Sequence, residues 1–93
     1  MSYVVVIVVP KLARRLKNNL APLGLAKQAR DDIASLQRDP YVGAVVRGSR
    51  FSRRLRYGPW RLLFAVFEAD GLVEVWRFRR KKPHGYARIP KEY

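Results

Sequence analysis

The stretch RRLRYGPWRLLFAVFEADGLVEVWRFRR, residues 53–80, decides the fold of this chain. It holds two apolar runs, and arginines stand before, within and after them. Gly58-Pro59 and Ala69-Asp70-Gly71 are turn signals between the runs, so we predict strands over residues 52–57, 60–67 and 72–79. Connections this short make neighbouring strands antiparallel. The strands that build the core would therefore also carry the arginines.

The residues before this stretch predict one strand, two helices and a further short strand. Residues 3–9, YVVVIVV, are almost all β-branched, and a continuous apolar run predicts a strand buried on both faces. After Pro10, leucines at every fourth position predict an amphipathic helix over residues 11–20, and a second apolar stripe predicts a helix over 25–36. The second helix should end before Asp39-Pro40, and residues 45–47 should form a short strand. Roughly four residues separate the two helices, which predicts an antiparallel hairpin.

The predicted fold is a small α+β domain. A strand comes first, then a helical hairpin, then a four-stranded antiparallel meander, so that the helices cover one face of a curved sheet and leave the other face open. The 93 residues predict one domain over residues 1–93. The apolar run near the N-terminus is too short to cross a bilayer, and we expect a cytoplasmic protein with no membrane contact.

Charge is the main compositional feature. The chain has 20 Lys and Arg against 7 Asp and Glu, a net charge of +13. From residue 47 onward there are 13 basic and 4 acidic residues, a net +9, so we expect the anion-binding surface on the later strands and the tail. Nucleic acid is the favoured partner because guanidinium groups match phosphate geometry. An acidic protein, an anionic membrane surface and a charge that serves only solubility are the alternatives.

The chain has few residues that could bind a metal ion or form a disulfide. There is no Cys and a single His, which excludes disulfides, thiolate metal sites and zinc sites built from several imidazoles. Neither G-x-G-x-x-G nor a P-loop occurs, no nucleophile elbow surrounds a serine, and the carboxylates are scattered. We therefore expect no cofactor.

One candidate phosphate site lies at the first turn of the quoted stretch. Arg54 and Arg56 share one face of a predicted strand, with Leu55 on the other face, and Arg61 opens the next strand. Pairing of these strands would bring guanidinium groups around one point, where an anion would relieve their repulsion. A solvated basic surface is the alternative for each of them taken alone.

A second candidate group closes the stretch. Arg77 and Arg79 should share one strand face, and Trp76 and Phe78 the other. The remaining candidate RNA-binding residues are Arg47, Arg53, Lys81 and Lys82.

The tail after the last strand supplies the remaining chemistry. His84 is the only side chain whose ordinary pKa lies near neutrality, so it is the candidate proton-transfer group, and an exposed loop histidine is the alternative. Tyr86 is a candidate for stacking on a base, and simple packing of the tail is its alternative.

The segment LRYGPWRLLF, residues 55–64, is similar to the LRxGxYRxxY core of the RelE/ParE superfamily of type II toxins. Residues 3–20, YVVVIVVPKLARRLKNNL, resemble the opening strand and helix of that superfamily, so the resemblance covers nearly the whole chain. It implies the RelE-like fold and a metal-independent endoribonuclease, an mRNA interferase that cuts messenger RNA in the ribosomal A site. It also implies an acidic, RelB-like antitoxin as the partner that keeps the toxin inactive.

The resemblance assigns roles to individual residues. In that reaction the ribose 2′-OH attacks the adjacent phosphorus and leaves a cyclic phosphate and a 5′-OH. By resemblance, Arg61 stabilises the phosphoryl group, Arg54 is the basic residue on the preceding strand, and Arg80 and Tyr86 are the tail arginine and tyrosine. The catalytic candidates are thus Arg54, Arg61, Arg80, His84 and Tyr86.

The chain departs from the superfamily at the position of the usual base. It has Ser52, Arg53 and Arg54 there, and arginine is a poor base because it stays protonated. Two alternatives therefore stand beside the ribonuclease: a ParE-like inhibitor of DNA gyrase, and a basic RNA-binding module without catalysis. The clustered arginines and His84 favour the ribonuclease.

Overall fold

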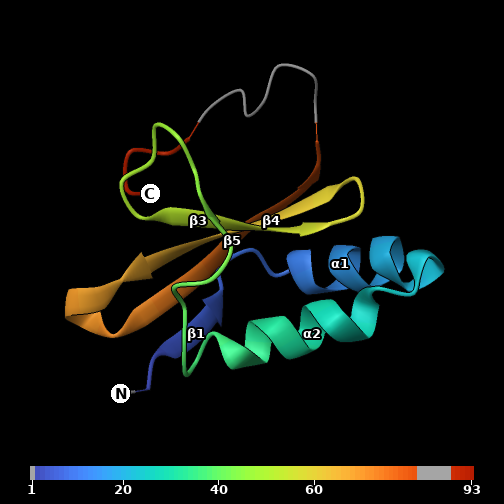
Figure 1. Ribbon diagram of the computed structural model, residues 1–93, viewed down its shortest axis with the longest axis horizontal. Coiled ribbons are helices and arrows are strands. Elements are labelled where there is room, and N and C mark those ends of the chain that lie inside the picture. Colours follow the sequence, from blue (N-terminus) through green and yellow to red (C-terminus); the bar gives the residue numbers. More distant parts are fainter. Residues whose placement is uncertain (1, 82–88) are drawn as a thin grey trace.

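A computed structural model describes residues 2–81 and 89–93 of the chain. Its five strands are β1 (Val4–Ile7), β2 (Ala44–Val45), β3 (Ser52–Tyr57), β4 (Trp60–Phe67) and β5 (Leu72–Arg80). The helices are α1 (Leu12–Leu20) and α2 (Ala26–Ser35), with short 3-10 turns η1 (Ala21–Leu23) and η2 (Glu68–Asp70). Figure 1 shows both helices on one side of the sheet and residues 89–93 on the other. The predicted α+β fold, with its helical hairpin and its meander, is confirmed. Within the described ranges no helix is long and apolar enough to span a membrane.

The sheet has the order β1-β5-β4-β3-β2. Strands β2 to β5 form the antiparallel meander, and β1 pairs with β5 in parallel. The central strand is β4, in which six consecutive residues, 61–66, are buried. Strands β3 and β5 pair with its two edges, and its side chains enter a separate core cluster on each face of the sheet.

The prediction for β1 was wrong about its burial, because this strand is not buried on both faces. It lies at the edge of the sheet, and Val4 and Val6 are 64% and 39% exposed. Only Val5 and Ile7 pack against the core. The strand also spans Val4–Ile7 rather than the predicted residues 3–9. A run of valines favours an extended backbone, but the topology determines how many neighbours the strand receives.

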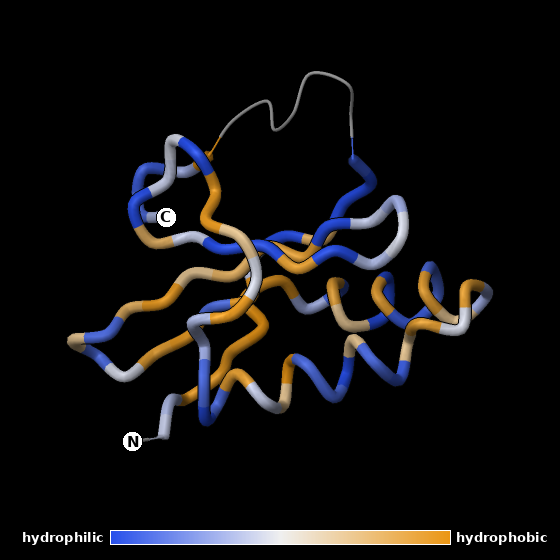
Figure 2. The backbone as a smooth tube through the Cα atoms, in the orientation of Figure 1, coloured by the Kyte–Doolittle hydropathy of each residue, from blue (hydrophilic) through white to orange (hydrophobic). Residues whose placement is uncertain are grey.

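The main core lies between the sheet and the helices. The predicted stripe of α1 is confirmed, since Leu12, Leu16 and Leu20 are all buried. Along α2, Ala29 is buried and Ile33 packs on the same cluster. Figure 2 shows hydrophobic and hydrophilic colours alternating along both helices, as expected for helices with one buried face.

The other face of the sheet is partly covered, which corrects the prediction that it is open. A second cluster forms there from Val46, Leu63, Ala65 and Trp76, and Ile89 and Tyr93 pack on it. The Tyr93 ring stacks on Trp76 with centroids 4.7 Å apart and an interplanar angle of 2°. Ile89 and Tyr93 therefore cover part of this face.

Polar contacts hold Tyr93 in place. Its hydroxyl donates to Oε2 of Glu74 at 2.6 Å, and its carbonyl oxygen accepts a hydrogen bond from the Phe51 amide at 2.9 Å and another from the Ser49 hydroxyl. Burial, and then the bond to Glu74, raise the pKa of the Tyr93 phenol well above its ordinary value. The phenol therefore remains a donor at neutral pH.

A bulge explains the position of Trp76. The β4–β5 register shifts between Leu63 and Phe64, so that Arg77 faces Leu63 while Val75 faces Phe64. Trp76 is the extra residue, and it joins the cluster away from the helices, whereas Phe78 belongs to the helix-side core. The prediction that Trp76 and Phe78 share a face was thus wrong, because a bulge interrupts the strict alternation on which it relied.

A partly buried hydrogen bond connects β3 to α2, and it yields a stability prediction. The Tyr57 hydroxyl donates to Oδ2 of Asp32 at 2.7 Å, and burial followed by this bond raises the pKa of Tyr57. Tyr57→Phe should lower the free energy of unfolding by about 1–2 kcal/mol, because a half-buried carboxylate loses its donor. Denaturant unfolding of Tyr57→Phe, Asp32→Ala and the double variant checks this. Additive losses would show that the two groups do not interact.

Candidate nucleic-acid interface

In the part of the chain that the structure describes, five arginines of the strands lie on the sheet face away from the helices, beside the cluster that Tyr93 covers. In the first cross-strand row Arg56 is opposite Arg61, and Arg61 is opposite Arg79. In the second row Arg54 and Arg77 flank Leu63. Residues directly opposite each other have Cβ atoms about 4.5–5.5 Å apart, and successive rows on one face are about 7 Å apart. We call this surface the arginine face, formed by Arg54, Arg56, Arg61, Arg77 and Arg79.

The turn between β3 and β4 fixes the first row. Gly58 and Pro59 are the two loop residues, and Tyr57 pairs with Trp60 across them. Gly58 has φ of +58°, a conformation that glycine adopts without a Cβ clash. A two-residue loop sets the register, so Arg56 must face Arg61 and Leu55 must face the helices. The predicted pairing of these strands is confirmed.

Arg61 is buried, with 4% of its surface exposed. Its Nη1 donates to the carbonyl oxygens of Gly58 at 2.9 Å and of Trp60 at 3.0 Å. Burial of a charged group is unfavourable unless it is hydrogen-bonded, and these carbonyls offset part of that cost. They also hold the guanidinium in one orientation at the middle of the first row.

Arg79 has a buried donor without an acceptor. Among the described residues, its Nη1 atom is buried and makes no hydrogen bond. Leaving a charged donor buried and unsatisfied is costly, and like charges directly opposite each other on a sheet add to the cost. An anion with several oxygens would satisfy the donor and reduce the repulsion at once.

The structure separates some of the predicted site residues from the arginine face. Arg80 pairs with Trp60, a helix-side residue, so it lies on the opposite face from Arg61. Arg53 also faces the helix side, where its Nε donates to the Val42 carbonyl at 2.9 Å. Arg47 is exposed after β2, and Lys81 is exposed after β5. Lys82, His84 and Tyr86 lie outside the described residues.

Two relationships were not predicted from the sequence. One is the direct pairing of Arg61 with Arg79, which the register of β4 and β5 establishes. Counting residues along both strands from the Asp70-Gly71 turn predicts this pair only if the one-residue bulge in β5 is included. The other is the position of Arg15 on α1, which lines a hollow with Arg79. The helical pattern of α1 does not distinguish Arg15 from Arg14, because both stand away from the leucine stripe.

If the arginine face binds anions, phosphate should stabilise the folded protein. Inorganic phosphate should raise the thermal midpoint, and at 100 times its dissociation constant one bound ion adds about 2.7 kcal/mol. Arg56→Ala should be slightly more stable without phosphate, since a like charge is removed, and should gain much less from it. Melting curves in phosphate and in chloride of equal ionic strength check this, with Arg38→Ala as the control. Equal phosphate shifts in both variants would contradict an anion site in the first row.

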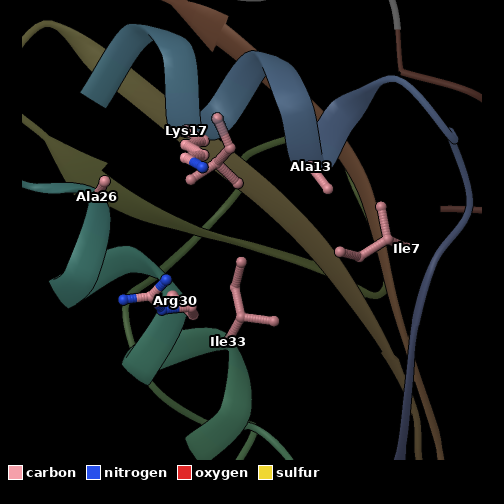
Figure 3. Close-up of a pocket in the computed structure, with 7 residues that line it drawn as sticks. Ile7, Ala13, Lys17, Ala26, Arg30 and Ile33 are labelled. Atoms are coloured by element: carbon pink, nitrogen blue, oxygen red, sulfur yellow. The ribbon is translucent and has the colours of Figure 1, made fainter. Parts of the chain in front are cut away.

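A different hollow lies among the helices. Apolar side chains from β1, α1 and α2 line a groove of about 240 Å³, and Lys17 and Arg30 stand at its rim (Figure 3). Its apolar lining residues are Ile7, Ala13, Leu16, Ala26 and Ile33. It is on the side of the sheet opposite the arginine face, so it fits an apolar partner surface better than phosphate. In the described ranges no three His, Asp or Glu side chains gather as a metal site.

Comparison with known proteins shows the fold. No family model matches the sequence, and no curated protein matches it. Among solved structures, a chain of the toxin–antitoxin complex RelBE2 from Mycobacterium tuberculosis is similar, with a TM-score of 0.58 and 24% sequence identity. The match covers 87% of this chain and 93% of that one. The fold is therefore RelE-like, as the sequence resemblance implied.

Proposed function

We propose that this protein is the toxin of a type II toxin–antitoxin system and that it cleaves messenger RNA on the ribosome. The observation that carries the proposal is the first row of the arginine face. There a buried Arg61, anchored by two carbonyls, lies between Arg56 and Arg79, and Arg79 holds a buried donor that finds no acceptor among the described residues. This is the arrangement that a phosphoryl group gaining negative charge requires.

The reaction would proceed by attack of the ribose 2′-oxygen on the adjacent phosphorus. A base takes the proton of the 2′-OH, the new bond forms to phosphorus, and the bond to the 5′-oxygen breaks as that oxygen gains a proton. The negative charge on the non-bridging oxygens would lie over Arg61 and its two row neighbours. For proton transfer we propose His84, and for base stacking Tyr86, both from the sequence. No metal ion or other cofactor takes part in the proposed reaction.

The second row and the outer cations would bind the flanking phosphates. Arg54 and Arg77 are half-buried one row away from Arg61, and the other basic residues lie further out. A net charge of +13 is more than a single phosphate requires, and it suits association with the RNA of the ribosome in the cytoplasm. Such binding should weaken steeply as salt increases, since each neutralised phosphate releases counterions.

An acidic antitoxin would be the protein partner. The similar chain comes from a toxin–antitoxin complex. This chain offers both surfaces that an acidic amphipathic segment needs: cations on the arginine face, and the apolar groove with Lys17 and Arg30 at its rim (Figure 3). Such a segment would compete with RNA wherever it covers the arginines.

A translation reaction tests the proposal. The purified protein is added to ribosomes translating a defined message, and the 5′ ends of the RNA are mapped. Cuts at fixed codon positions that need the ribosome are expected, and they should disappear in Arg61→Ala. Intact message together with cleaved DNA in a gyrase reaction would instead identify a gyrase inhibitor. If RNA binds but neither product forms, the protein is a binding module.

A further inference from the structure

A second basic surface lies where β5 loses its outer neighbour. Strand β1 pairs only with Leu72–Val75, so in the described part of the chain the rest of β5 has a free edge on that side. At this edge there is a surface hollow of about 500 Å³. Its basic lining residues come from β5, from the residue after it and from α1, and they are Arg15, Arg77, Arg79, Arg80 and Lys81. None of the lining residues within 2–81 and 89–93 is acidic.

An aromatic pair forms the rest of the hollow. Trp60 and Phe78 stack with centroids 4.8 Å apart and an interplanar angle of 8°. Phe78 is fully buried, whereas Trp60 is half-buried and lines the hollow. Cations around an accessible indole are the combination by which proteins bind single-stranded nucleic acid without reading its sequence.

The hollow is continuous with the arginine face. Arg77 and Arg79 belong to the two rows on the sheet and also line the hollow. The cations therefore extend from the arginine face around the free edge of β5 to Arg15 on α1. In Figure 2 the tube has the hydrophilic colour at the end of β5, next to the grey trace, as expected for its two closing arginines.

We infer that the hollow binds the continuation of a single RNA strand whose reacting phosphate lies on the arginine face. Phosphates contact Arg15, Arg80 and Lys81, and a base stacks on Trp60. RNA fits better than an acidic peptide because carboxylates would use the cations but not the indole. The inference rests on the proposed function only in placing RNA on the arginine face, and it adds a subsite on the other side of β5.

The test uses two 2′-O-methyl RNAs, which cannot be cleaved by attack of the 2′-oxygen, and measures their binding by fluorescence anisotropy. A dinucleotide can occupy the arginine face alone, whereas an octanucleotide reaches the hollow. The variants are Arg15→Glu and, as a matched control, Arg14→Glu, which reverses the charge of another exposed arginine of α1 that does not line the hollow. Arg15→Glu should weaken octanucleotide binding about tenfold, and the slope of log K against log salt should fall in magnitude by about 0.7 or more. Arg14→Glu should change the affinity for the octanucleotide less than about twofold. Neither variant should lower the affinity for the dinucleotide by more than about twofold.

Several results would overturn the inference. If the octanucleotide binds wild type and both variants equally, or weakens equally in both, the hollow is not a subsite, and the proposed function still stands. An octaglutamate peptide that binds as tightly as the octanucleotide and is equally sensitive to Arg15→Glu would identify a site for an acidic protein instead. If neither RNA binds the wild-type protein, the proposed function fails together with the inference.

Discussion

Arg61→Ala should lower ribosome-dependent RNA cleavage about 100- to 1,000-fold, because one preorganised donor to a developing oxyanion is worth about that much. Arg61 is buried, and two carbonyls fix its guanidinium between Arg56 and Arg79. The charge therefore needs no reorganisation when the phosphoryl group becomes more negative. Mapped RNA ends from translation reactions, quantified over time, measure the effect.

Two controls separate chemistry from folding. Arg61→Met keeps most of the apolar stem and removes the charge, so it should fold like the wild type and cleave as slowly as Arg61→Ala. Arg38→Ala changes an exposed arginine after α2 and should cleave at the wild-type rate. Cleavage by Arg61→Met within about threefold of wild type would show that Arg61 does not stabilise the reacting group.

Trp76→Ala should lower the free energy of unfolding by about 3–5 kcal/mol, the usual range for a buried tryptophan. Trp76 packs on Leu63 and Ala65, its indole nitrogen donates to Oγ of Ser52 at 3.0 Å, and Tyr93 stacks on its ring. Removing it takes away the surface on which residues 89–93 lie. Urea unfolding followed by circular dichroism measures the loss.

The Tyr93→Ala variant serves as its matched control. The loss in the double variant should be smaller than the sum of the single losses, because each ring is the stacking partner of the other. If Trp76→Ala lowers the free energy of unfolding by less than about 1 kcal/mol, its effect is close to that of a surface substitution. Residues 89–93 would then not be docked on this face.

Local patterns predicted the elements well where the sequence period and the turn chemistry agree. Strands β3 and β4 have the predicted bounds, since Gly58-Pro59 leaves only a two-residue loop between them. The helices match within two residues at each end, because the leucine spacing of α1 and the apolar stripe of α2 reflect one buried face each. Element order and fold class followed from these segments.

What depends on contacts between distant segments could not be predicted in the same way. The valines of β1 do not show that this strand lies at the edge of the sheet next to β5, and nothing about Trp76 shows that a bulge turns it away from the helices. The docking of Tyr93 is also a long-range contact, with partners 19 residues away at Glu74 and 44 residues away at Ser49. The alternation of apolar and polar residues describes one strand at a time. The features above depend instead on which strands pair with each other.

In the candidate site, too, local pairing could be predicted from the sequence and long-range pairing could not. The position of Arg56 opposite Arg61 followed from a short loop, and it is the part of the site that the sequence predicted. The position of Arg79 next to Arg61, the separation of Arg80 onto the other face, and the approach of Arg15 all required the sheet to be assembled.

The most direct test of the arginine face is to observe its guanidinium groups while RNA binds. Nuclear magnetic resonance of the arginine Nε–Hε groups can follow each side chain during titration with a 2′-O-methyl dinucleotide. We predict that Arg56, Arg61 and Arg79 shift together at saturation, while Arg14 and Arg38 do not. Shifts confined to Arg30 at the helix groove, with Arg61 and Arg79 unchanged, would contradict the assignment of this sheet face to RNA.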